Sequence, residues 1–124
     1  MKQFTRQIKV SPDTLGELTA YLLDSISTDP DKKRMALIIC PGGGYKHVSD
    51  REGEPIAAQF LSMGYHAFVL RYSLAPHVFP ASLKELASAM AMVRANADEW
   101  KVDPNRILVC GFSAGGHLAA SLGI

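Results

Sequence analysis

The stretch Gly111-Phe112-Ser113-Ala114-Gly115 decides the expected fold, because it joins a strand-like segment to a helix-like one. Residues 107–110 before it are apolar, and residues 116–120 after it are typical of a helix. Gly-x-Ser-x-Gly between a strand and a helix is the pattern of a nucleophile elbow, in which small flanking residues allow a sharp turn that exposes the serine hydroxyl. The motif predicts acyl transfer in which Ser113 is the nucleophile and the backbone N–H of Ala114 helps to bind the oxyanion.

A second glycine motif occupies the place where further oxyanion donors are expected. Pro41-Gly42-Gly43-Gly44-Tyr45 follows the continuous apolar run at residues 35–40. Glycines let successive backbone N–H groups approach a substrate closely, and one such donor is typically worth about 3 kcal/mol of transition-state stabilisation. Either motif alone is a weak signal. Together, each after an apolar strand and before a helix, they favour a catalytic site over two structural turns.

The rest of the chain alternates between strand and helix patterns. Residues 4–10 and 18–22 alternate between apolar and polar side chains, which predicts two antiparallel, half-exposed strands. Residues 35–40, 66–72 and 107–110 are apolar runs, typical of parallel strands that are covered on both faces. We therefore expect an α/β fold, a three-layer α/β/α sandwich whose sheet is mostly parallel and carries an N-terminal antiparallel hairpin.

Two helices are expected between the parallel strands. The first begins near Pro55, which suits a first helical turn, and Gly64 is expected to end it. The second carries a capping box at Ser82 and Glu85 and is expected to run unbroken to Trp100 with one apolar face.

Length and composition indicate one domain that spans residues 1–124, since 48% of the 124 residues are hydrophobic. The net charge of +1 indicates neither a nucleic acid nor a membrane as partner. No stretch approaches the ~20 apolar residues of a membrane span, and no apolar segment of a signal peptide follows the N-terminus, so we expect a cytoplasmic protein. Cys40 and Cys110 are expected to be buried, reduced thiols; a disulfide between them would be unusual in a cytosolic chain.

Most of the other polar residues near the motifs are expected to stabilise local structure rather than to take part in catalysis. Asp103 is expected to cap the turn before the last strand, and His66 to begin a strand. Residues 50–52 are expected to order the loop into the first helix, with a role in a pocket as the alternative. His47 follows the glycine-rich segment and stays a weaker candidate for a place near the site.

Phosphate-binding interpretations fail on detail. Residues 111–116 have the outer spacing of a P-loop, but His117-Leu118 stands where lysine and a hydroxyl residue are required. Gly42-Gly43-Gly44 lacks the third glycine of a dinucleotide-binding fingerprint. Nucleotide binding is therefore not expected.

With both glycine motifs in place, the chain resembles the N-terminal half of an α/β-hydrolase of the esterase and lipase superfamily. It is most similar to the bacterial branch related to hormone-sensitive lipases and sugar-acetyl esterases. The resemblance covers the chain from about residue 35 to its end. The matching segments are Pro41-Gly42-Gly43-Gly44-Tyr45, Arg51-Glu52-Gly53-Glu54-Pro55, Arg71-Tyr72-Ser73-Leu74-Ala75-Pro76, Val102-Asp103-Pro104-Asn105-Arg106-Ile107 and Gly111-Phe112-Ser113-Ala114-Gly115-Gly116-His117.

The resemblance implies roles for particular residues. Ser113 would be the nucleophile, and the backbone N–H groups of Gly43, Gly44 and Ala114 would form the oxyanion hole. Tyr45 would lie near the mouth of the pocket. The resemblance implies no metal and no cofactor.

The substrate implied is a small-molecule ester with a short acyl group, such as an acetyl ester on a sugar. The lipase-like pattern has histidine before the glycines, where this chain has Pro41. This departure favours the sugar-esterase side of the branch.

The acid and the histidine of the triad follow the serine in this fold. After Ser113 the sequence contains no carboxylate and one histidine, His117, which is expected to pack or to line the pocket rather than act as the base. Both partners are therefore expected beyond Ile124, in a truncated α/β-hydrolase fold that stops in the helix after the elbow. The strand at residues 107–110 would then lie at an exposed sheet edge. Through this edge we expect the chain to form a homo-oligomer or to bind the missing C-terminal half.

Two functional hypotheses follow. The first is a carboxylic-ester hydrolase that works through an acyl-enzyme at Ser113, although the 124-residue chain alone is expected to be inactive. The second is a non-catalytic half-domain that only folds or associates with a partner.

Overall fold

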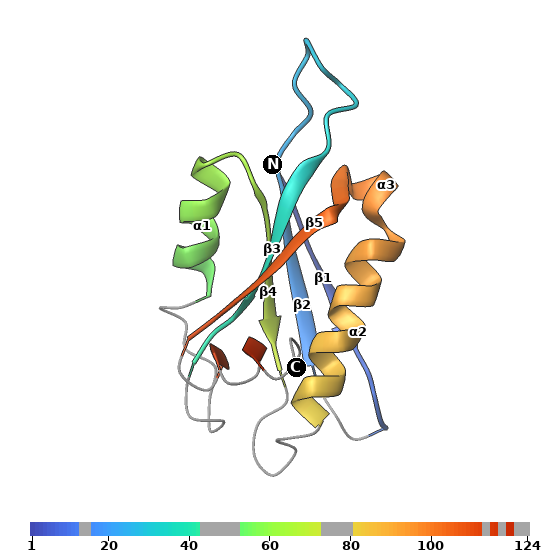
Figure 1. Cartoon of the computed structure of the whole chain (residues 1–124), viewed down its shortest axis with the longest axis vertical. Coiled ribbons are helices and arrows are strands. Elements are labelled where there is room, and N and C mark those ends of the chain that lie inside the picture. The colour runs from blue at the N-terminus through green and yellow to red at the C-terminus, as the bar shows by residue number, and fades with distance from the viewer. Residues whose placement is uncertain (13–15, 43–52, 73–80, 113–114, 117–118, 121–124) are drawn as a thin grey trace.

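The computed structural model describes residues 1–12, 16–42, 53–72, 81–112, 115–116 and 119–120. Figure 1 shows a twisted sheet with helices on both of its faces. Five strands pair in the order β1-β2-β4-β3-β5. Their bounds are β1 Lys2–Ile8, β2 Gly16–Leu22, β3 Arg34–Cys40, β4 His66–Arg71 and β5 Val102–Gly111, and the helices are α1 Glu54–Ser62, α2 Ala81–Ala95 and α3 Ala97–Trp100.

The sheet is mixed, with the predicted antiparallel hairpin at one side and parallel strands at the other. β1 pairs with β2, and β2 with β4, in antiparallel directions. β3 pairs in parallel with β4 and with β5. In β2, Leu18, Ala20 and Leu22 form the expected buried face, but the expectation of a half-exposed strand is wrong at Tyr21, which is buried on the opposite face in the cluster with Ala57 of α1.

One face of the sheet is covered by α1 (Figure 1). Pro55 lies in the first turn of this helix, and Gly64 follows its C-cap with φ of 92°, a left-handed conformation that costs glycine little. Ala57 packs there against Ile39 and Val69, which alternate with residues that point to the other face. The sequence expectations for this helix are confirmed.

The opposite face is covered by α2 and α3, against which the larger of the two apolar clusters packs. The rings of Phe68 and Trp100 lie 5.7 Å apart in this cluster. The single long helix that the sequence predicts is divided at Asn96, whose side-chain amide donates to the carbonyl of Met92 at 2.8 Å. The backbone N–H of Asn96 donates to the same carbonyl at 3.1 Å, and the division lies in the backbone of Asn96, whose ψ of 14° is not helical.

The capping box predicted at Ser82 and Glu85 is wrong. Ser82 lies inside α2 rather than before it, and its buried hydroxyl has no hydrogen-bond partner among the described residues. Glu85 is fully buried and packs on Gly16, where an added Cβ would lie 2.8 Å from the carboxyl carbon. A larger residue at position 16 would therefore require the buried carboxyl group of Glu85 to move.

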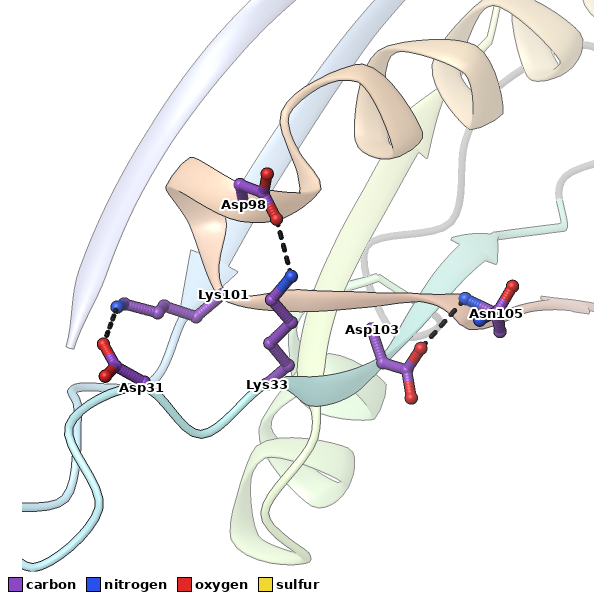
Figure 2. A network of polar contacts seen from close by, with 6 residues as sticks. All are labelled: Asp31, Lys33, Asp98, Lys101, Asp103 and Asn105. Carbon is purple, nitrogen blue, oxygen red and sulfur yellow. Dashed lines mark hydrogen bonds and ion pairs between the residues drawn. The ribbon is translucent and has the colours of Figure 1, made fainter.

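Polar side chains link the elements at the amino ends of the parallel strands (Figure 2). Lys33 pairs with Asp98 at 2.5 Å, and Lys101 with Asp31 at 3.4 Å. These pairs are exposed and contribute little to stability. The backbone N–H of Asn105 donates to the carboxylate of Asp103 at 3.0 Å. The expectation that a turn at residues 103–105 precedes the last strand is wrong, because β5 already begins at Val102 and these residues lie where its pairing with β3 shifts register.

His66 begins β4, as expected, and it is 1% exposed. Its Nδ1 accepts a hydrogen bond from the backbone N–H of Leu23 at 3.1 Å. Its Nε2 lies 3.1 Å from the carbonyl oxygen of Lys101 and must donate to it, so the ring is neutral. Burial lowers the pKa of His66; the hydrogen bond to the carbonyl of Lys101 opposes this, and the charge of Arg34 lowers the pKa further.

The described helices include none whose length and hydropathy would allow it to span a bilayer.

Candidate active site

The two glycine motifs begin at the same edge of the sheet, the carboxyl edge, where the parallel strands end. In the parallel register, Ile39 of β3 lies between Val69 of β4 and Cys110 of β5, and Cys40 lies beside Gly111. The carboxyl ends of the three strands therefore meet at one edge. Crevices at this edge are where open α/β sheets bind their ligands.

The chain turns from strand to helix where the elbow is predicted. The backbone N–H of Phe112 donates to the carbonyl of Cys40 at 3.1 Å, and that of Gly115 donates back to the carbonyl of Phe112 at 2.9 Å. Residues 115–116 and 119–120 are helical. The motif requires a strand before the serine and a helix after it, and both are present, on either side of residues 113–114.

Close packing explains why both outer residues of the motif are glycine. A Cβ on Gly111 would lie 2.5 Å from the carbonyl carbon of Gly115, and a Cβ on Gly115 would lie 2.6 Å from the carbonyl oxygen of Pro41. Real Cβ atoms essentially never approach other atoms so closely. The turn therefore packs directly on the backbone where the chain leaves β3 for the glycine-rich segment.

Tyr72 makes a contact at this edge that sequence reasoning missed. Its side chain is 2% exposed, and its hydroxyl donates a hydrogen bond to the carbonyl oxygen of Pro41. The sequence places Tyr72 one residue beyond β4 within a segment that matches the family. This position alone does not reveal a partner 31 residues away.

A hollow of about 380 Å³ opens on the α1 side, beside the first turn of that helix. It is lined by Glu54, Pro55, Ala58 and Arg71. Arg71 is two residues beyond Val69, and Phe112 is two beyond Cys110, so the hollow and the elbow strand share one edge and one face of the sheet.

The charges of this hollow also act on Tyr21. Burial raises the pKa of Tyr21, and the carboxylate of Glu54 raises it further, whereas Arg71 opposes the rise. The sequence gives no signal for a pocket here, since Glu54 is the usual acidic residue of a first helical turn.

The two cysteines are free, as expected, but the expectation that both are buried is wrong for Cys110, which is half-buried. The register also excludes a disulfide between them. Cys40 and Cys110 lie on paired strands, but Cys110 is level with Ile39, so the two side chains point to opposite faces of the sheet. Burial raises the pKa of Cys40 to about 12, with a further contribution from Cys110. A thiol that stays protonated at neutral pH is a poor nucleophile.

The residues predicted to do the chemistry lie outside the described residues. These are Ser113, Gly43, Gly44, Ala114, Tyr45 and His117. The same holds for His47 and for residues 50–52. What the structure does describe is the backbone that leads into and out of both motifs. Within that described part, no group of three or more histidine, cysteine or acidic side chains could hold a metal ion.

Comparison with known proteins gives the family. Residues 23–124 match the BD-FAE family model. Esterase LipC of Mycobacterium tuberculosis is 36% identical over 113 residues, which are 88% of this chain and 28% of LipC. An acetylxylan esterase of Xylanibacter ruminicola is 29% identical over 120 residues, which are 96% of this chain and 23% of that enzyme.

A solved structure agrees in fold. The α/β-hydrolase MGS-M1, from a Medee basin deep-sea metagenome library, superposes with a TM-score of 0.90 at 44% identity. The match covers 98% of this chain and 50% of MGS-M1. The chain thus spans half the length of this structure and about a quarter of the length of the two curated relatives named above. On its motifs, its fold and these matches, the chain belongs to the BD-FAE family of bacterial esterase- and lipase-like α/β-hydrolases, of which it corresponds to an N-terminal portion.

Proposed function

We propose that the protein containing this chain is a carboxylic-ester hydrolase whose nucleophile is Ser113. The observation that carries the proposal is a close contact between the chain after β5 and residues 40–42, which are called here the exit of β3. At this contact Gly115 approaches the carbonyl of Pro41. This packing supports the proposal because Gly115 ends the predicted serine elbow and Pro41 begins the predicted oxyanion segment, the two parts that acyl transfer needs. The names of the related esterases point to the same activity.

The proposed reaction has two steps. The Ser113 oxygen attacks the ester carbonyl while its proton passes to a histidine base, and the alcohol leaves with that proton. Water then attacks the acyl-enzyme by the same route and releases the carboxylic acid. In both steps the N–H groups of Gly43, Gly44 and Ala114 stabilise the oxyanion. The histidine and its acid are proposed to come from sequence beyond Ile124.

The proposed substrates are esters of short acyl groups, including acetyl esters on sugars. The support is the acetylxylan esterase among the relatives, together with Pro41 at the position where lipase-like sequences have histidine.

The side of β5 that faces away from β3 has no neighbouring strand in the described sheet. This open side is relevant to the second hypothesis, a half-domain that only associates. β5 is an edge strand of the described sheet, and Leu108 on it is 52% exposed beside Leu37. Exposed apolar edge strands are prone to pair with further strands. We propose that the missing part of the protein covers this edge, and that in its absence a second copy of the chain does so.

Hydrolysis of p-nitrophenyl acetate tests the proposal and separates the two hypotheses. The full-length protein is expected to be active, Ser113→Ala to lose activity, and the exposed-serine control Ser62→Ala to keep it. Residues 1–124 alone are expected to show only background hydrolysis. Equal rates for the full-length protein and for Ser113→Ala would support the non-catalytic half-domain instead.

A further inference from the structure

The exit of β3 is held from both neighbouring strands. On the β5 side, the carbonyl of Cys40 accepts the backbone N–H of Phe112 at 3.1 Å. On the β4 side, the next carbonyl, that of Pro41, accepts the hydroxyl of Tyr72. Two successive backbone carbonyls at the start of the glycine-rich segment are thus each given a fixed donor.

The bond from Tyr72 fixes more than one carbonyl. A peptide unit is planar and trans, so the carbonyl of Pro41 and the N–H of Gly42 point in opposite directions. A donor that holds the carbonyl oxygen therefore also sets the direction of the Gly42 N–H. Gly43 and Gly44 follow directly in the sequence.

Tyr72 is well placed to act as a rigid donor. It is 2% exposed and belongs to the apolar cluster beneath α2, together with Phe68 and Leu70 of β4. Packing on all sides leaves the ring little freedom, and burial keeps water from replacing the hydroxyl easily. Pro41 and Gly42 are also buried.

We propose that Tyr72 is a positioning residue for ester hydrolysis, whose hydroxyl orients the Pro41-Gly42 peptide and thereby the oxyanion donors that follow it. The inference rests on the proposed esterase function. Tyr72 acts through the backbone and does not touch the substrate.

The test uses the full-length protein with Tyr72→Phe, which keeps the ring and removes only the donor. The matched control is Tyr65→Phe, a half-buried tyrosine directly before β4, at the opposite end of the parallel strands from the glycine motifs. When the oxyanion donors are misplaced, the enzyme binds the transition state less tightly but binds the substrate as before. Tyr72→Phe is therefore expected to lower kcat about tenfold and to leave KM within about twofold. The affinity for a boronic acid transition-state analogue is expected to fall by the same factor as kcat. Tyr65→Phe is expected to change none of these.

The outcomes separate this inference from the proposed function. A folded Tyr72→Phe variant with unchanged kcat and unchanged analogue affinity overturns the positioning role while leaving the esterase in place. A rise in KM at constant kcat also overturns it. An inactive wild type overturns both.

A second variant is used where thermal melting shows that Tyr72→Phe does not fold. Replacement of Tyr72 by 3,5-difluorotyrosine keeps the ring and the donor but lets the phenol ionise at lower pH. Because a phenolate cannot donate, kcat is expected to fall as pH rises through that ionisation, at pH values where the wild type stays active. Identical pH profiles would overturn the proposal.

Discussion

Gly115→Ala and Gly116→Ala differ by one position, yet the structure predicts opposite effects. A Cβ on Gly115 would lie 2.6 Å from the carbonyl oxygen of Pro41, whereas a Cβ on Gly116 meets nothing closer than 3.4 Å, at the carbonyl oxygen of Gly111. The Cβ on Gly115 would lie closer still to the carbonyl oxygen of Cys40, so the first variant must move backbone to reach an ordinary contact.

The size of the effect follows from what has to move. Backbone cannot rotate away as a flexible side chain does, so Gly115→Ala is expected to lower the free energy of unfolding by about 1–3 kcal/mol. The same shift displaces the elbow from the glycine-rich segment, for which a fall in kcat of about 10²-fold is expected. Gly116 lies in a helix, where alanine is favoured over glycine by about 0.5–1 kcal/mol, so Gly116→Ala is expected to be neutral or stabilising.

Urea denaturation gives the free energies of both variants in the full-length protein, and p-nitrophenyl acetate hydrolysis gives kcat. Equal m-values would show that the same surface unfolds in each case. If Gly115→Ala matched the wild type within about 0.5 kcal/mol and kept its kcat, the close packing inferred at this turn would be refuted.

Three further predictions concern histidine, cysteine and the sheet edge. Because the pKa of His66 is lowered in the folded state, the contribution of neutral His66 to the free energy of unfolding should be fully present above pH 6.5 and should be lost as pH falls from 6.5 toward the folded pKa. His66→Asn should flatten this decline in stability, and an unchanged slope would contradict the role given to His66. When the folded protein is treated with iodoacetamide, peptide mapping should find the half-buried Cys110 modified and the buried Cys40 intact. Equal modification of the two cysteines would contradict the burial of Cys40. Residues 1–124 alone should associate in sedimentation velocity, and Leu108→Lys should weaken this association; no change would show that the β5 face is not the contact.

The sheet and its layers could be predicted because local patterns determine them. Continuous apolar runs identified β3 and β4, and the turn signals Pro55 and Gly64 located α1. The order of the motifs then predicted which strand ends meet. Each of these inferences uses residues that are close together in the sequence.

Features that depend on distant partners could not be predicted. Periodicity assigns polar residues to the outer face of a helix, so it missed the buried Ser82 and Glu85, the latter packed on Gly16 of another element. It also predicted one helix over residues 82–100, because the apolar spacing continues past Asn96, where the backbone leaves the helical conformation. The bond from Tyr72 to Pro41 likewise joins residues that no local pattern connects.

The glycines of the elbow were predicted for a different reason from the one the structure gives. The sequence indicates small residues that allow a sharp turn. The structure adds that Gly115 has no room for a side chain against the exit of β3. The candidate site is therefore shaped by contact between two motifs that are about 70 residues apart in the sequence.

The central claim, that Ser113 is the nucleophile, is tested most directly by covalent labelling. The full-length protein is treated with a fluorophosphonate, digested and mapped by mass spectrometry. One adduct is predicted, on the peptide that contains Ser113, with none in Ser113→Ala. An adduct on another residue, with Ser113 unmodified, would contradict the claim.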